Sequence, residues 1–422
     1  MRLGALVMAF TMSVTSCNKE YLNPSAASEP QVVNDVNGLI TLCNGIQFRY
    51  TVGRASPGYT LPSANGLVTK ELAVLNAGNA DEDFLRLGGA NVIGVNSIVS
   101  NLWAQSNIVK ASADIILKNS DKATDPATKA GIVGYASIFR ALALANLGTF
   151  WEKAPIAVGE NATFSTREEV LRDAVRQLEA AATLGLPSAN FTSRVAGGID
   201  VPNTIQALIA RLSLSVGDYD KAIAAADKVD ITKRSVFTFD DLSRNPMFDA
   251  TFSNRNVTEP VNTGFSLPDA IKADVADKRT AFFFNRTGGT NPPNLARASF
   301  FIANTTALPV YRPGEIILIK AEALARKNNV AGAITELNKV LTKKTDVAGI
   351  GADLPAYAGA AAQADVLTEI YKQRCIELYL TGMKLDDSRR FGRPAAERSR
   401  TFFPYPQNER DNNTSTPADP AN

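Results

Sequence analysis

The sequence predicts a mainly α-helical protein, in which tetratricopeptide-like helical hairpins form a scaffold that carries two long loop-rich excursions. Three observations support this prediction. Apolar residues recur at helical spacing along much of the chain. Two segments repeat one pattern of small residues at the spacing of a helical hairpin. Between these segments, and again nearer the N-terminus, clusters of Gly, Pro and Asn interrupt the helical pattern.

The first residues have the pattern of a bacterial lipoprotein signal. An apolar run from Leu3 to Val14 is much shorter than the ~20 residues that span a bilayer. The letters VTSC, residues 14–17, match the lipobox, in which an aliphatic and two small residues precede a cysteine. We therefore expect residues 1–16 to be a signal peptide and residues 17–37 a tether, lipidated at Cys17. An ordinary signal with a chance cysteine is the alternative.

Two helices are predicted from their N-terminal signals. Asp125 and Pro126 suit the N-cap and first position of a helix that runs to about residue 147. Thr166 and Glu169 form a capping box that opens a helix over about 167–184. The apolar residues of the second helix fall on one stripe: Val170, Leu171, Ala174, Val175, Leu178 and Ala181. We expect these two helices to form a degenerate hairpin.

Two later segments predict clearer hairpins. Ala210 and Ala222 stand 12 residues apart, as do Ala321 and Ala333. Small residues at this spacing let the two helices of a tetratricopeptide hairpin approach closely at their crossing. Stacked hairpins of this kind share a continuous core, but they do not by themselves specify a ligand.

After the tether, we divide the chain into three parts. Residues 38–229 form an N-terminal part with helical hairpins, and residues 314–422 form a C-terminal part. Residues 230–313 form a loop-rich, ligand-binding excursion, because Asn-Pro, Gly-Gly and Pro-Pro pairs leave no sustained helical period there. A second irregular region runs from Asn44 to Asn96. Loops of such length are uncommon unless they are functional.

Composition excludes several classes of function. Lys and Arg number 44 against 42 Asp and Glu, a net charge of +2 without a basic block, which argues against a nucleic-acid partner. The absence of histidine excludes Ser-His-Asp and Cys-His catalysis and His-containing metal sites. No catalytic residue, cofactor or metal ion is predicted. Cys43 and Cys375 could pair in an oxidising compartment, but their apolar contexts favour buried free thiols.

The C-terminal sequence carries motifs of a known family. The letters IYKQRCIELYLTGMKLDDSRRFGRP and then RTFFPYPQNERDNN resemble the SusD/RagB family of nutrient-binding outer-membrane lipoproteins. That family shows Arg-x-x-Glu-Leu, then Gly, a basic residue and Asp before Arg-Trp-Gly, and later Phe-Pro-x-Pro followed by an acidic residue and Asn. The matching positions are Arg374, Glu377, Leu378, Gly382, Lys384, Asp387, Arg390, Gly392, Phe403, Pro404, Pro406, Glu409 and Asn412. The departures are Thr381, Lys384, Ser388 and Phe391, the last standing where the family has Trp.

The charged residues of the first motif are better explained by structure than by chemistry. Arg374 and Glu377 are three residues apart on one helix, where opposite charges can pair. Asp387 and Arg390 could extend this pair into a network that holds the C-terminal segment on the scaffold.

The resemblance implies a binding protein at the cell surface, lipid-anchored in the outer membrane. Such a protein sits as a lid on a SusC-like TonB-dependent outer-membrane transporter and passes oligosaccharide, or another small nutrient, to it. Two other classes remain as alternatives. A tetratricopeptide adaptor would bind peptide or protein. A glycosidase would need two close carboxylates, for which Asp81 with Asp83, or Asp240 with Asp241, are the acidic clusters available.

The candidate ligand-binding residues come from both irregular regions. Asn79, Asp81 and Arg86 lie before the helix that contains Trp103, where the family's carbohydrate contacts often fall. Trp103 could be a stacking platform or a core residue. Lesser candidates come from the second excursion: Phe283, Asn285 and Arg286.

The lipid assignment predicts the behaviour of a Cys17→Ala variant. This variant should fold normally but lose its membrane association, because the anchor would be covalent lipid on the cysteine sulfur. Fractionation after a high-salt wash measures the effect. If the variant still pellets with membranes, Cys17 is not the anchor.

Overall fold

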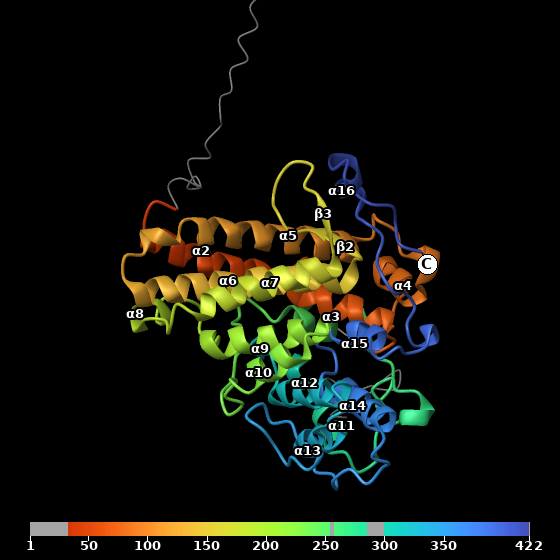
Figure 1. Cartoon of the computed structure of the whole chain (residues 1–422). Coiled ribbons are helices and arrows are strands. Elements are labelled where there is room, and N and C mark those ends of the chain that lie inside the picture. Colours follow the sequence, from red (N-terminus) through yellow and green to blue (C-terminus); the bar gives the residue numbers. More distant parts are fainter. Residues whose placement is uncertain (1–32, 254–256, 285–298, 422) are drawn as a thin grey trace, which may run out of the picture.

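A computed structural model of the protein describes residues 33–253, 257–284 and 299–421. The signal peptide, most of the tether, Asn285 and Arg286 lie outside these ranges. The described chain is mainly helical, as predicted, with only short strands (Figure 1).

The upper layer consists of helices that pack side by side (Figure 1). Its helices are α2 (Val36–Thr51), α3 (Pro57–Val68), α4 (Ala80–Leu87), α5 (Ser97–Lys118), α6 (Pro126–Phe150), α7 (Arg167–Ala182) and the short α8 (Ala189–Thr192). Among the described residues, α6 is long and apolar enough to cross a membrane, but nearly all of that stretch is buried inside the protein. Helix α6 is therefore the central core helix of this layer.

The N-terminal signals predicted for α6 and α7 are confirmed. The side chain of Asp125 accepts a hydrogen bond from the backbone N–H of Thr128. Thr166 and Glu169 form both halves of a capping box. The predicted apolar stripe of α7 is buried throughout and faces α6 and the next helix, α9.

The lower layer contains the two predicted hairpins (Figure 1). They are formed by α9 (Val201–Ser215) with α10 (Tyr219–Ala226), and by α12 (Pro313–Arg326) with α13 (Val330–Leu341). Their four crossing alanines are fully buried: Ala210, Ala222, Ala321 and Ala333. The C-terminal part adds α14 (Gln363–Glu377), α15 (Lys384–Arg390) and α16 (Gln407–Asn412).

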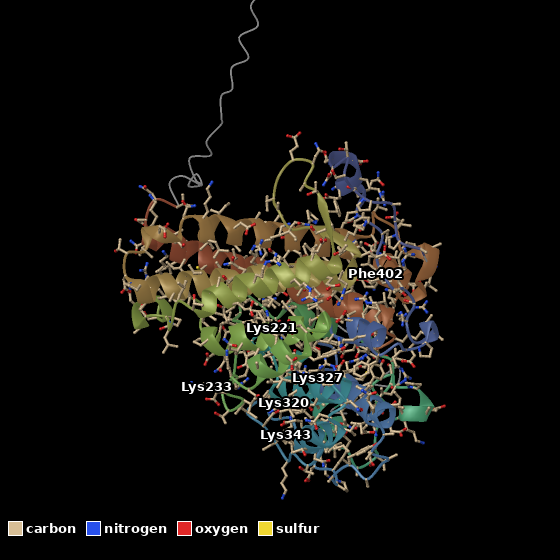
Figure 2. The ribbon with its side chains drawn as sticks, viewed as in Figure 1. Lys221, Lys233, Lys320, Lys327, Lys343 and Phe402 are labelled. Carbon is tan, nitrogen blue, oxygen red and sulfur yellow. The ribbon has the colours of Figure 1, made fainter. Side chains whose placement is uncertain are left out.

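Ion pairs join the neighbouring hairpins. Lys320 of α12 pairs with Asp227 just after α10, at 2.6 Å between Nζ and Oδ1. Lys327 pairs with Asp220, and Figure 2 shows both lysines on the same side as Lys221 of α10. These contacts are partly exposed, so we assign most of the stability of the junction to the buried helix packing.

The strands form three antiparallel pairs of two or three residues each. They pair β1 (Leu72–Val74) with β5 (Thr258–Pro260), β2 (Lys153–Pro155) with β3 (Phe164–Thr166), and β4 (Val236–Phe237) with β6 (Leu308–Pro309). The remaining short helical turns are η1 (Gly89–Asn91), η2 (Ser120–Lys122), η3 (Phe248–Phe252), η4 (Asp269–Ile271), α11 (Arg279–Phe283), η5 (Ser299–Phe301) and η6 (Ala395–Glu397). The described part of 230–313 therefore contains only short elements; β1–β5 attaches it to the segment after α3, and β4–β6 joins its two ends to each other.

The prediction of an irregular region from Asn44 to Asn96 was wrong for more than half of its length, because α2 continues to Thr51, α3 follows, and α4 lies in its second half. The glycines of α3 suggested a loop, but they allow close packing. A Cβ on Gly58 would lie 2.8 Å from the backbone oxygen of Thr51, and one on Gly66 would lie 2.9 Å from Leu72 Cδ1. Tertiary packing thus overrides the low helix propensity of these residues.

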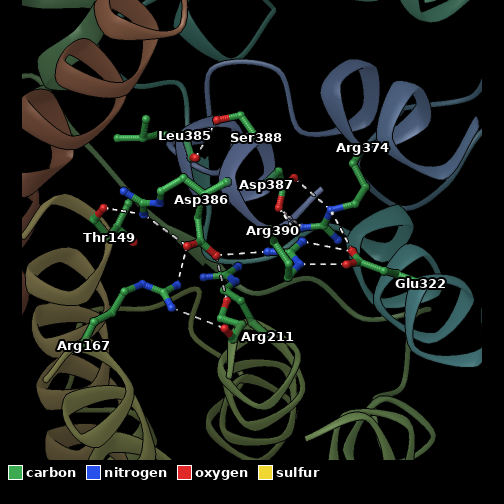
Figure 3. Close-up of polar contacts among 12 residues, drawn as sticks. Thr149, Arg167, Arg211, Glu322, Arg374, Leu385, Asp386, Asp387, Ser388 and Arg390 are labelled. Carbon is green, nitrogen blue, oxygen red and sulfur yellow. Dashed lines mark hydrogen bonds and ion pairs between the residues drawn. The ribbon is translucent and has the colours of Figure 1, made fainter. Parts of the chain in front are cut away.

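The predicted C-terminal charge network is present, with different partners (Figure 3). Arg374 does not pair with Glu377. It donates two hydrogen bonds to Asp387, of 2.8 and 3.0 Å, while Glu377 pairs with Arg279 at 3.0 Å. Arg390 pairs with both Asp387 and Glu322, at 2.6 and 2.7 Å. The network therefore fixes α15 against α12 and α14 through contacts that helical spacing alone does not predict.

Both remaining cysteines are buried free thiols, as the sequence favoured. Cys43 lies in α2 and Cys375 in α14. Burial raises the pKa of each thiol, to about 12 for Cys375, so neither is a reactive thiolate near neutral pH.

The hairpin formed by α9 and α10 predicts an overpacked variant. Ala222→Phe should lower the free energy of unfolding by ~1 to 3 kcal/mol, because Ala222 is 0% exposed and its site has no space for a ring. Ala224→Phe is the matched control, since Ala224 is exposed on the same helix. Thermal melts compare the two. An equal, small effect of both substitutions would contradict a close helix crossing at Ala222.

A buried carboxyl group makes the stability depend on pH. Glu71, just before β1, is 1% exposed, and burial raises its pKa to about 7 although the charge of Lys384 acts to lower it. Its pKa in the unfolded chain is about 4.3. The folded state therefore favours the protonated form, and the contribution to stability present below pH ~4.3 is lost as the pH rises to about 7.

Glu71→Gln should remove this pH dependence. Relative to the wild type, the variant should gain stability as the pH rises, by roughly 3 kcal/mol at most between pH 5 and 8. Urea unfolding of both proteins at the two pH values measures the difference, since all other titrating groups are shared. Parallel pH profiles would show that Glu71 titrates normally in the folded protein.

Candidate functional site

Helix α4 and the turn before it carry three of the predicted ligand residues. Asn79 lies at the N-cap position, and its side-chain amide donates to the backbone oxygen of Asn76 at 3.2 Å. Asp81 lies in the first turn, where its carboxylate accepts a hydrogen bond from the Ser97 hydroxyl. The backbone oxygen of Asp81 accepts from the side chain of Asn96 at 2.9 Å. Asp81 therefore also joins α4 to the start of α5.

Arg86 is the most accessible of the three. Its side chain is 44% exposed and pairs with Asp83 one turn earlier, at 2.7 Å between Nη2 and Oδ1. Phe84 and Leu87 on the same helix are 37% and 48% exposed. A guanidinium group beside exposed apolar side chains can bind a ligand that has both hydroxyl groups and apolar C–H faces. We define Asn79, Asp81 and Arg86 with these neighbours as the α4 surface.

Trp103 is a core residue, and a stacking role for it is not available in this structure. It is 3% exposed and packs against three aromatic rings: Trp151, Phe164 and Tyr405. Its indole N–H donates to Glu409 Oε2 at 3.0 Å. Of the two roles left open for Trp103, the core role is confirmed and the ligand-binding role is corrected, because three rings from other segments pack against it.

Phe283 is likewise buried, at 0% exposure. It lies at the end of α11 among Phe265, Phe300 and Tyr379, with the guanidinium of Arg312 at 5.3 Å from its ring centre. In Figure 1, α11 lies in the lower layer and α4 beside the upper one. Phe283, the described member of the second predicted group, thus does not lie with the residues of α4.

A polar cleft that the sequence analysis did not predict lies on α5, where the β2–β3 loop meets α16. Its volume is about 250 Å³. Its polar lining residues are Asn107, Lys110, Glu160, Asn161, Glu409, Asn412 and Asn413. We call this the α16 cleft. Glu409 and Asn412 belong to the recognised C-terminal motif, and this was the sequence signal that could have located it.

The α16 cleft is built on buried polar groups. Lys110 is 1% exposed, and its ammonium donates to the backbone oxygen of Pro155 at 2.5 Å. Burial lowers the pKa of Lys110 to about 8, although the charges of Asp114 and Glu409 act to raise it. Glu409 also accepts from Asn413 Nδ2 at 2.9 Å. Trp103 therefore acts indirectly, by orienting one carboxylate oxygen of Glu409.

The chemistry of both surfaces is that of hydrogen bonding. Amide and carboxylate groups line both, with the guanidinium of Arg86 on the α4 surface and the ammonium of Lys110 in the α16 cleft, so these side chains supply both donors and acceptors. Within the described ranges, no group of three or more His, Cys, Asp or Glu residues is arranged to hold a metal ion.

Comparison with known proteins defines the family. The model of the SusD family matches residues 255–421. No match was found among curated proteins. Residues 255–421 therefore belong to the SusD family, which confirms the SusD/RagB resemblance of the C-terminal motifs.

Solved structures extend this similarity to the fold of the whole described chain. A SusD-like carbohydrate binding protein from Bacteroides vulgatus is 19% identical, with 88% of this chain and 86% of that chain covered and a TM-score of 0.68. SusD superfamily proteins from Bacteroides fragilis and Bacteroides thetaiotaomicron are 16% and 15% identical, with TM-scores of 0.69. These matches cover 91% and 92% of this chain and 99% and 100% of the other chains. The chain therefore has the SusD fold.

Proposed function

We propose that this protein is a surface-exposed binding protein that captures oligosaccharide, or a similar polyhydroxylated nutrient, without chemical change. The observation that carries the proposal is the SusD fold and family, combined with hydrogen-bonding side chains on the α4 surface and in the α16 cleft. One similar structure is described as a SusD-like carbohydrate binding protein.

The contacts of the acidic residues favour binding over hydrolysis. Asp83 is paired with Arg86, and Asp81 accepts from Ser97. Asp240 accepts hydrogen bonds from the backbone of Leu242 and Ser243 at 2.8 and 2.6 Å. Each carboxylate is engaged within its own turn or helix junction, whereas a glycosidase would direct two carboxylates at one sugar bond.

Delivery is the second part of the proposal. A lipid on Cys17 would hold the protein at the outer-membrane surface, and the partner would be a SusC-like TonB-dependent transporter. Tethering keeps the binding protein at high local concentration over such a partner, so that weak capture still feeds transport. The proposal needs no cofactor.

Arg86→Ala tests the α4 surface. If Arg86 contacts ligand hydroxyls, the variant should bind the cognate glycan about 10- to 150-fold more weakly, because a charge-assisted hydrogen bond contributes roughly 1.5 to 3 kcal/mol. Its melting temperature should hardly change, since Arg86 is exposed and an exposed ion pair contributes ~1 kcal/mol or less. Calorimetry against a glycan panel and a melt of the same sample measure both quantities.

Arg176→Ala is the matched control for this experiment. Arg176 is exposed and pairs with Asp173 three residues earlier on α7, as Arg86 pairs with Asp83 on α4. The control should bind the glycan normally. Equal binding by both variants would place the ligand elsewhere, with the α16 cleft as the next candidate. Asp81→Ala is less informative, because loss of the contact to Ser97 also changes stability.

A further inference from the structure

A second cleft lies between α12, α14 and α15, on the lower layer of the protein. Its volume is about 280 Å³. Three arginines and two aromatic rings contribute to its lining: Arg326, Arg390, Arg393, Tyr371 and Phe391. We call it the arginine cleft. It shares no residue with the α4 surface or the α16 cleft.

The aromatic rings hold the guanidinium groups in place. The guanidinium carbon of Arg326 lies 5.0 Å from the ring centre of Phe391, and that of Arg393 lies 4.9 Å from the ring centre of Tyr371. Each arginine also pairs with one acid: Arg326 with Glu322 at 2.8 Å and Arg393 with Glu397. The groups are therefore fixed before any ligand arrives, which lowers the entropy cost of binding.

In the part of the chain that the structure describes, Arg326 and Arg393 each have one side of the guanidinium group that is not used in a hydrogen bond. The hydrogen bonds of Arg326 use Nε and Nη2, and those of Arg393 use the same two nitrogens. Within the described residues, Nη1 of neither side chain has a hydrogen-bond partner. Their side chains are 19% and 20% exposed, so each remains in contact with solvent. Two guanidinium edges are thus available to an incoming acceptor.

The buried network beside the cleft carries an excess of positive charge (Figure 3). Ion pairs link five arginines with three carboxylates, a net charge of +2. The arginines are Arg167, Arg326, Arg374, Arg389 and Arg390, and the acids are Glu322, Asp386 and Asp387. Backbone oxygens at the ends of α6 and α9 accept from Arg389 and Arg167 and offset part of this charge.

Backbone oxygens of the described ranges do not offset the positive charge on the α14 side of the network. Arg374, at 2% exposure, has a buried Nη1 with no hydrogen-bond partner among the described residues. Arg390 uses all three of its nitrogens on acids that other arginines share. An anion placed at the cleft would therefore sit in a positive field that the protein itself does not neutralise, where low dielectric strengthens the attraction.

We propose that the arginine cleft binds an oxyanion, namely a carboxylate, sulfate or phosphate group. Guanidinium groups present planar pairs of donors that match the oxygens of these anions. The cleft is smaller than the 300 to 1,000 Å³ typical of sites for drug-sized ligands, which fits a free anion or one acidic sugar residue. The site is independent of the proposed glycan role, because inorganic sulfate is enough to occupy it.

Calorimetry on the purified full chain tests the proposal with sulfate, phosphate, glucuronate and neutral glucose. Sulfate and glucuronate should bind, and glucose should give no signal that depends on this cleft. If glucuronate binds at least 10-fold more tightly than sulfate, the sugar ring adds contacts and an acidic saccharide is the source. Similar affinities identify a free inorganic anion as a sufficient ligand. Absence of binding by all three anions overturns the proposal.

Two variants with a matched control locate the binding. Arg393→Gln should weaken sulfate binding roughly 10-fold or more, because it removes a charged donor at the cleft. Phe391→Trp should also weaken it, by filling the cleft with the larger residue that the family motif carries at this position. Arg172→Gln, which breaks a pair with Glu168 at the same four-residue spacing as Arg393 with Glu397, should bind normally. Unchanged binding in both cleft variants, each shown to be folded by its melt, overturns the assignment.

Discussion

The buried network centred on Asp386, Asp387 and Arg390 is the interaction on which the rest of the structure depends. Asp386 pairs with arginines from α7 and α15, and Asp387 with Arg374 of α14. Although burial acts to raise the pKa of Asp386, the charges of Arg167, Arg389 and Arg390 together hold it below its usual range. Short helix α15 thereby links the upper layer to the lower one, beside an apolar core that also runs through both layers.

Each member of such a network depends on its partners. Taking several charges out of water costs several kcal/mol for each ion, and close partners only offset that cost. Removing one member therefore leaves others buried and unpaired, which is more damaging than the loss of one contact. The same logic applies to the loop-rich excursion. Arg279, at 0% exposure, pairs with Asp277 of its own turn and with Glu377 of α14. A segment without long helices is thus held on the scaffold by charge.

Local signals predicted the helices well, because caps and apolar stripes depend on neighbours within one or two turns. The capping box of α7 and the alanine crossings are examples. Predictions that depended on distant partners failed. Trp103 is covered by residues up to 306 positions away, and Arg374 prefers Asp387 to the nearby Glu377. The glycines of α3 suggested a loop because the sequence does not show which chain segment will approach them.

The same difference between local and distant contacts applies to the candidate site. The α4 surface was predictable, since its residues are close in sequence and lie in and just before one short helix. The α16 cleft was not, because it combines α5, the β2–β3 loop and α16. The motif residues Glu409 and Asn412 suggested importance but not a place. Their position became clear only when Trp103 and Asn413 were seen to hold Glu409 at the cleft wall.

Two buried charge networks differ in their net charge, and this difference separates a network that only holds segments together from one that lies beside a binding site. Beside α11, Arg279 and Lys343 face three acids: Asp277, Asp346 and Glu377. Arg312, which is buried nearby and donates to backbone oxygens at the end of α14, brings this group to neutrality. The network at α15 instead keeps two positive charges in excess, and the arginine cleft opens beside it. A protein that needed these charges only for support would balance them, as it does at α11. Arg326 and Arg390 of this network also line the cleft, which is the physical reason to regard the arginine cleft as a binding site.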